Sequence, residues 1–138
     1  MDEGRLKHCY GVAKKMIEIA KNMNLSKEEI EELYFLGFNH DAAYEFCENG
    51  KNHDIIGGEI LKRCGYKYWK EIYYHGKLQT EYDSKYLRIL NKADMQIDSH
   101  GNDVGYDGRL KDIEERYGKD SIVYHNCVEY SKFCRRED

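Results

Sequence analysis

Histidines and aspartates recur at positions where the surrounding sequence predicts the buried face of a helix. The clearest case is His40-Asp41, which ends an apolar run that begins at Leu33. A buried carboxylate costs several kcal/mol unless a cation, a metal ion or hydrogen-bond donors compensate its charge. The alternative is a pair of surface side chains at a frayed helix end, and this segment by itself leaves both interpretations open.

A second carboxylate shows the same anomaly further along the chain. Asp94 lies between Leu90 and Ile97 on the apolar stripe of a predicted helix, and Asp98 follows one turn later. A carboxylate on such a stripe requires a cation or several donors. Asp94 therefore favours a charge-compensating centre in the interior over a chance surface pair.

Three further histidines lie near inner helix faces. His8 is at the edge of an apolar stripe, His53 is near the start of a predicted helix, and His75 is in the last turn of the next one. Each has a structural alternative, such as a protonated His75 stabilised by the helix C-terminus. Four imidazoles and two carboxylates together are better explained by a metal site. The candidate ligands are His8, His40, Asp41, His53, His75 and Asp94.

The elements that position these residues are predicted to be helices. Apolar residues recur at helical spacing, and proline is absent. One helix starts at the capping box Ser26-Lys27-Glu28-Glu29 and delivers His40-Asp41, and Gly37 in it would let another backbone approach closely. The other predicted helices span 5–23, 53–64, 67–75, 83–98, 108–117 and 119–134. Loops are predicted at 48–52 and at 99–108, the latter as a candidate rim of the site. The sequence thus predicts an all-α fold of about seven helices.

Size and composition narrow the classes of function. The 138 residues predict a single domain, 1–138, and no apolar run is long enough to cross a membrane. The N-terminus lacks the features of a signal peptide. The net charge of −4 argues against a stable nucleic-acid partner. Five cysteines, an odd number without a Cys-x-x-Cys motif, favour reduced thiols and a cytoplasmic protein.

The order His8, His40-Asp41 and Asp94 resembles the core pattern of the HD-domain superfamily of metal-dependent phosphohydrolases. The resemblance covers residues 5–98, and His53 and His75 match the additional histidines of its two-metal members. It implies an HD-domain-like helical bundle with a metal site in a central cleft. It also implies that Asp41 and His40 are the catalytic pair.

Two segments look most like the bacterial branch that cleaves diadenosine tetraphosphate symmetrically. They are residues 53–61 and 71–75, and Arg5, three residues before His8, adds to the likeness. Tyr44 is a departure, because that branch commonly has a lysine three residues after the dyad aspartate. The chain is also shorter than expected for that branch.

The resemblance implies a division of the ligands between two ions. The first ion would be held by His8, His40, Asp41 and Asp94. The second would be held by His53 and His75, with Asp41 bridging. Imidazole and carboxylate ligands suit iron or manganese, with zinc as an alternative. Two ions can activate water for in-line attack on phosphorus. Arg5, Lys92 and Arg109 are candidates for binding substrate phosphate, although each is otherwise an ordinary surface charge.

The predicted activity is hydrolysis of a phosphoester or phosphoanhydride in a small-molecule nucleotide, with no membrane partner. One alternative is a non-catalytic, metal-containing domain that binds a nucleotide as a sensor or interaction module, which turnover would distinguish. Another is oxygenase chemistry at a di-iron site, which oxygen dependence would reveal. The sequence leaves the oligomeric state open.

Overall fold

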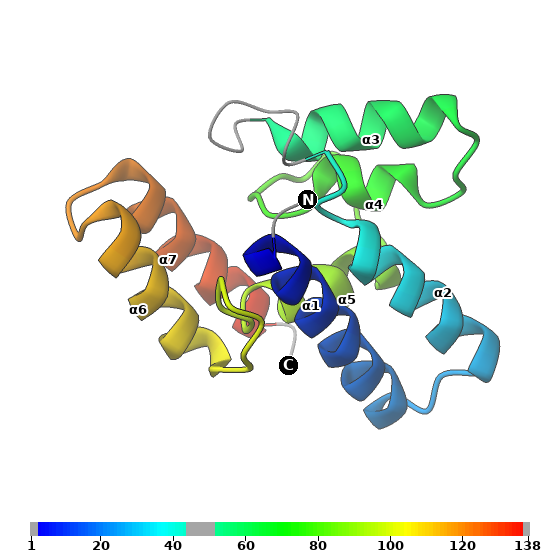
Figure 1. The fold of residues 1–138 in the computed structure, drawn as a ribbon, viewed down its shortest axis with the longest axis horizontal. Helices are drawn as coiled ribbons and strands as arrows, with labels where there is room; N and C mark the ends of the chain where they lie inside the picture. Colours follow the sequence, from blue (N-terminus) through cyan, green and yellow to red (C-terminus); the bar gives the residue numbers. More distant parts are fainter. Residues whose placement is uncertain (1–2, 44–51, 137–138) are drawn as a thin grey trace.

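Seven helices make up the fold in the computed structural model, which describes residues 3–43 and 52–136 (Figure 1). They are α1 (Glu3–Asn22), α2 (Lys27–Asn39), α3 (His53–Arg63), α4 (Trp69–Tyr74), α5 (Lys85–Asp94), α6 (Gly105–Tyr117) and α7 (Ile122–Arg136). Within the described ranges there is no strand, and extended chain pairs only in an isolated bridge between Ile97 and Asp103. The prediction of an all-α fold with about seven helices is confirmed.

Helix α5 is the centre of the arrangement, because it packs against α1, α2, α4 and α7 (Figure 1). The α1–α2 pair, the α3–α4 pair and the α6–α7 pair lie on different sides of it. Its buried residues Ile89 and Leu90 belong to a core shared with α1, α2 and α4. A smaller apolar cluster, which contains Met95, Tyr130 and Cys134, fixes the α6–α7 hairpin to the end of α5.

The helix starts follow the capping chemistry expected from the sequence. The Ser26 hydroxyl accepts a hydrogen bond from the Glu29 backbone N–H at 3.1 Å, and the Glu29 carboxylate accepts one from the Ser26 N–H at 3.2 Å. Ser84 caps α5 in the same way, because its hydroxyl accepts from the Leu87 N–H at 3.0 Å. These caps fix where α2 and α5 begin.

Helix α5 ends at Asp94, four residues before the predicted end at residue 98. The Asp98 carboxylate accepts hydrogen bonds from the backbone N–H groups of His100 and Asn102, both at 2.9 Å. Gly101 in this turn has a φ of +85°, which favours glycine. The Asp98 side chain thus stabilises a non-helical turn in the backbone, and this turn replaces a further turn of the helix. Asp94 becomes the last residue of the helix.

The other helix ends differ from the predicted ones by a few residues. Helix α4 is shorter than the predicted 67–75, α6 starts before residue 108, and α7 starts after residue 119. The predicted loop at 48–52 lies outside the described residues apart from Asn52, which precedes α3. These shifts leave the order of the elements unchanged.

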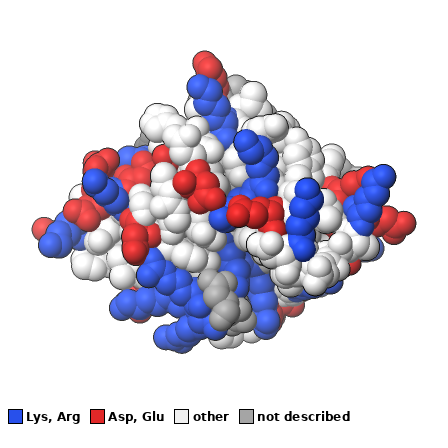
Figure 2. All heavy atoms as spheres, turned by 90° about the horizontal axis from the view of Figure 1, so that it is seen from below, with Lys and Arg blue, Asp and Glu red and all other residues white. Residues whose placement is uncertain are grey.

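Charge is unevenly distributed over the surface. On the face drawn in Figure 2, lysine and arginine side chains gather in the lower part, whereas in the middle and upper part acidic side chains alternate with further lysines and arginines. Among the helices of the described chain, none combines the length and the apolar character that a membrane span requires. The net charge of −4 therefore does not describe this basic region of the surface.

Gly37 allows α1 and α2 to approach closely, as the sequence predicted. We expect Gly37→Ala to lower the free energy of unfolding by about 1–3 kcal/mol, the usual cost of overpacking a core. The added Cβ would lie 2.9 Å from the Ala13 Cα and 2.6 Å from the Met16 Sδ. Equilibrium urea denaturation followed by circular dichroism measures the change.

Gly57→Ala is the matched control for this test. Gly57 is also buried within a helix, but its added Cβ would meet Ile72 at 3.4 Å, an ordinary van der Waals contact. Because alanine favours helix over glycine by about 1 kcal/mol, this variant should keep or gain stability. Equal losses in the two variants would contradict the close-packing explanation for Gly37.

Candidate metal centre

The six candidate ligands converge from five helices although they span 87 positions of sequence, from residue 8 to residue 94. His8 comes from α1, His40 and Asp41 follow α2, His53 opens α3, His75 follows α4, and Asp94 closes α5. Three groups of them bring one ligand atom per residue within 4.8 Å of each other, the separation that one metal ion can span. These groups are His8–His40–Asp41, His40–His75–Asp94 and Asp41–His53–His75.

Asp41 lies at the middle of the cluster, and its two carboxylate oxygens face different histidines. Its Oδ1 is 3.1 Å from His53 Nε2 and 3.6 Å from His75 Nε2. Its Oδ2 is 3.3 Å from His40 Nε2 and 3.7 Å from His8 Nε2. Its side chain is only 3% exposed. A carboxylate placed in this way can contact two ions at once.

Asp94 faces the Oδ2 side of the cluster. Its Oδ1 lies 3.0 Å from His8 Nε2 and 3.5 Å from His40 Nε2. His8 and His40 thus face both carboxylates, whereas His53 and His75 face the other oxygen of Asp41. His75 also offers a ligand atom within 4.8 Å of those of His40 and Asp94, so it lies between the two groups. Because α5 ends at Asp94, the carboxylate is held at the inner end of the central helix.

Three imidazoles are oriented by backbone carbonyls. The Nδ1 atoms of His8, His40 and His75 lie 2.9, 2.6 and 2.5 Å from the carbonyl oxygens of Asp98, Gly37 and Ile72, respectively. Because a carbonyl oxygen only accepts, each Nδ1 carries the hydrogen and each Nε2 faces the carboxylates. This is the arrangement by which proteins orient metal-binding histidines.

The Nε2 atoms then require a positive charge between them and the carboxylates. An Nε2 lone pair facing a carboxylate oxygen is repelled, so either a proton or a metal ion must lie between the two. Among the described residues, neither His40 Nε2 nor Asp41 Oδ1 has a hydrogen bond of good geometry, although both atoms are buried. A metal ion satisfies several such atoms at once, so the donor set fits a divalent cation.

The charges of the cluster shift its protonation equilibria. Burial raises the pKa of Asp41 and Asp94, but neighbouring histidines outweigh burial and hold the pKa of both carboxyls well below the usual range. Burial lowers the pKa of His40, but the two carboxylates outweigh it and raise this pKa. The carboxylates are therefore ionised and hold positive charge in the centre.

Cys9 lies close to the cluster but does not match its chemistry. Burial, followed by the charge of Asp41, raises the pKa of the Cys9 thiol to about 12. Since a metal-binding cysteine is a thiolate, we do not count Cys9 among the candidate ligands.

A cleft of about 320 Å³ opens over the cluster between the helical core and the α6–α7 hairpin. Arg5 and Arg109, two of the predicted phosphate-binding residues, line it together with the candidate ligands other than His40. The Arg5 Nη1 donates to Asp41 Oδ2 at 2.9 Å, and the Arg109 Nη1 donates to Asp112 Oδ2 at 2.9 Å. The structure thus brings both guanidinium groups to the cleft of the candidate metal centre.

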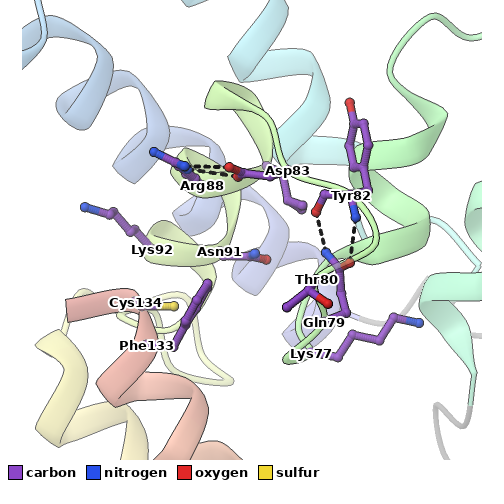
Figure 3. A pocket seen from close by; sticks show the side chains of 11 residues that line it. Lys77, Gln79, Thr80, Tyr82, Asp83, Arg88, Asn91, Lys92, Phe133 and Cys134 are labelled. Atoms are coloured by element: carbon purple, nitrogen blue, oxygen red, sulfur yellow. Dashed lines mark hydrogen bonds and ion pairs between the residues drawn. The ribbon is translucent and has the colours of Figure 1, made fainter. Parts of the chain in front are cut away.

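Lys92, the third predicted phosphate-binding residue, lies elsewhere. It lines a separate cavity with Asn91 and Phe133, shown in Figure 3. It also borders a groove beside Ile19 at the end of α1. The structure therefore separates Lys92 from Arg5 and Arg109. Tyr44 lies outside the described residues.

Arg116 and Tyr117 were not identified from the sequence as residues of the site. Both line the cleft from the last turn of α6. A signal was present, because Arg109, Ile113 and Arg116 recur at helical spacing and all three line the cleft. The predicted rim at 99–108 does not line the cleft. Residues 99–104 follow Asp98, whose carbonyl orients His8, and residues 105–108 begin α6.

Comparison with known protein families gives one finding that bears on this centre. The HD domain family matches residues 5–96, well over half of the chain. Comparisons with curated proteins and with solved structures gave no match. The matched range contains all six candidate ligands and ends before α6. The chain therefore belongs to the HD domain family, a superfamily of metal-dependent phosphohydrolases.

Proposed function

We propose that this protein is a metal-dependent phosphohydrolase that acts on a nucleotide through a centre of two metal ions. The position of Asp41 carries the proposal, because its two oxygens face separate pairs of histidines. A mononuclear site has no need of a central carboxylate whose second oxygen faces a further pair of imidazoles. Membership of the HD domain family supports the hydrolytic chemistry.

The distances between the carboxylate oxygens of Asp41 and Asp94 and the histidine Nε2 atoms support two ligand sets. One ion would be held by His8, His40, Asp41 and Asp94, because each of the two histidines faces both carboxylates. The other would be held by His53, His75 and the second oxygen of Asp41. This mixture of imidazole and carboxylate favours iron or manganese, with zinc as an alternative, over magnesium. When bound, the two ions supply Lewis-acid activation of water and neutralise charge on the phosphoryl oxygens.

The protein's own groups orient the reaction. The carbonyl of Gly37 fixes the ring of His40, and the ionised Asp41 holds the centre together, so these two residues form the proposed catalytic pair. Arg5 lines the cleft, and its Nη1 donates a hydrogen bond to Asp41 Oδ2 at 2.9 Å. From this position the Arg5 guanidinium can also bind a substrate phosphate. Arg109 occupies a second position suited to phosphate binding.

For the substrate we propose diadenosine tetraphosphate, cleaved into two molecules of ADP. The support is the likeness of residues 53–61 and 71–75 to the bacterial enzymes that perform this cleavage. Tyr44 in place of their lysine removes one positive charge from the region after the dyad. Loss of one charge-assisted hydrogen bond lowers binding or rate by roughly ten- to a hundredfold. We therefore expect weaker activity on this substrate than in that branch.

Incubation of the iron- or manganese-loaded protein with diadenosine tetraphosphate is expected to yield ADP as the sole product. The balance is one water consumed at a central phosphoanhydride and two ADP released. Chromatography separates ADP from AMP and ATP, the products of asymmetric cleavage. Simple nucleotides and cyclic dinucleotides are assayed in parallel.

Chelator-treated protein is the control for metal dependence. Turnover of another nucleotide class alone would retain the phosphohydrolase and reject this substrate. Metal-loaded protein that binds nucleotides but turns none of them over would reject hydrolysis in favour of a sensor or interaction module.

A further inference from the structure

Helix α6 presents one face to the cleft above the candidate metal centre. Arg109, Ile113, Arg116 and Tyr117 line the cleft from this helix. Their spacing of four, three and one residues places them on one side of an α-helix. Helix α6 lies outside the range that matches the HD domain family.

The three arginines of the cleft differ in how their charge is compensated. Arg5 pairs with Asp41 at 2.9 Å, and Arg109 pairs with Asp112 at 2.9 Å. Arg116 has no carboxylate within ion-pair distance in the part of the chain that the structure describes. Its guanidinium lies 5.2 Å from the Tyr117 ring centroid, and its Nη2 is 3.5 Å from the Tyr117 hydroxyl. Arg116 therefore brings an uncompensated positive charge to the cleft.

Contact with Tyr117 orients Arg116 without using up its capacity to bind. A guanidinium has five N–H donors, and a cation–π contact at an exposed site is weak. The tyrosine ring limits the positions of the arginine side chain, while most of its donors stay available. A planar donor set of this kind matches two oxygens of one phosphoryl group.

Arg109 and Arg116 mark two different depths of the cleft. The Arg109 side chain is 12% exposed, whereas Arg116 is an exposed residue in the last turn of the helix. Seven residues correspond to roughly 10 Å along a helix axis. When one phosphoryl group of a substrate is bound at the metal centre, Arg116 is therefore available to bind another group further along the same substrate.

We propose that Arg116 is a specificity-determining residue that binds a second phosphoryl group, so that the cleft selects substrates with a polyphosphate chain over monophosphates. This inference rests on the proposed function for the identity of the reaction, but the binding it describes is measurable without turnover. Recognition is electrostatic and bidentate, and it acts on the part of the substrate that is remote from the reacting phosphorus.

Binding of inorganic tripolyphosphate and of orthophosphate to the metal-loaded protein tests this proposal by titration calorimetry. We expect Arg116→Ala to weaken tripolyphosphate binding by roughly tenfold, the lower range for a charge-assisted hydrogen bond at an exposed site, and to leave orthophosphate binding unchanged. The tripolyphosphate affinity of Arg116→Lys should lie between those of the wild-type protein and Arg116→Ala, because lysine keeps the positive charge but lacks the planar guanidinium. Metal content is measured after each titration, since polyphosphates chelate metals.

Lys111→Ala is the matched control, because Lys111 is an exposed cation of the same helix that does not line the cleft. It should leave both affinities unchanged. Equal weakening by Lys111→Ala and Arg116→Ala, equal weakening of both ligands by Arg116→Ala, or no effect of Arg116→Ala would each overturn the proposal. So would a wild-type protein that binds tripolyphosphate no better than orthophosphate. Absence of nucleotide turnover would reject the proposed function, while the ratio of the two affinities would still decide the role of Arg116.

Discussion

Replacing Asp41 with asparagine is expected to release both metal ions and to reduce hydrolysis to background. Asp41 is the residue shared by the two ligand sets, and the amide keeps its volume while removing its negative charge. Loss of a group that merely supports a ligand costs up to about a hundredfold in metal affinity or activity. Loss of the central carboxylate should exceed that, because His8, His40, His53 and His75 all face it.

Elemental analysis of protein reconstituted with iron or manganese measures this effect, alongside the hydrolysis rate and the circular dichroism spectrum. Asp120→Asn is the matched control, because Asp120 is an exposed aspartate between α6 and α7 that does not line the cleft. A native-like Asp41→Asn protein with its full metal content would remove Asp41 from the ligand set. Wild-type protein that takes up no metal on reconstitution would reject the metal centre altogether.

The sequence was sufficient for the helical order because capping and periodicity are local properties. Ser26 and Ser84 cap α2 and α5 through contacts within three residues, so the starts of these helices can be predicted. The end of α5 could not, because it depends on the Asp98 turn, whose backbone also holds His8. Helical periodicity predicts that the helix continues through Asp98, whereas the Asp98 carboxylate competes with helical hydrogen bonding.

The candidate centre could be predicted from the sequence because its residues are ionisable although they lie on or near apolar helix faces. Asp94 is such a residue, and in the structure its Oδ1 lies 3.0 Å from His8 Nε2. The residues that line the walls of the cleft were harder to predict from the sequence. Lys92 precedes Asp94 by two residues, a spacing that directs the two side chains to different faces of a helix. Arg116 shares a helical stripe with Arg109, which is a local signal. That this stripe faces the cleft depends on the packing of α6 on α7 and of α7 on α5, and the contact between α7 and α5 is long-range.

Removal of His53 or His75 is expected to lower the metal content from two ions to one per chain. Both residues face the Oδ1 side of Asp41, whereas His8, His40 and Asp94 surround its Oδ2 side. His53→Ala is the cleaner variant, because its side chain is 28% exposed and its loss leaves no buried cavity. His75 is 2% exposed, so His75→Gln keeps its volume better than alanine would.

Metal stoichiometry and hydrolysis are measured on the same preparations, with His125→Ala as the control because His125 is an exposed histidine of α7 outside the cleft. A fall to one ion with loss of hydrolysis shows that the second position is needed for turnover. A fall to one ion with hydrolysis retained assigns the reaction to the ion held by His8, His40, Asp41 and Asp94. If the wild-type protein holds one ion and both variants keep that ion and full activity, the centre is mononuclear. The division of the Asp41 oxygens between two sets of histidines is then a structural feature of the charged core. If the wild-type protein and both variants hold two ions, His53 and His75 are not ligands of the second ion.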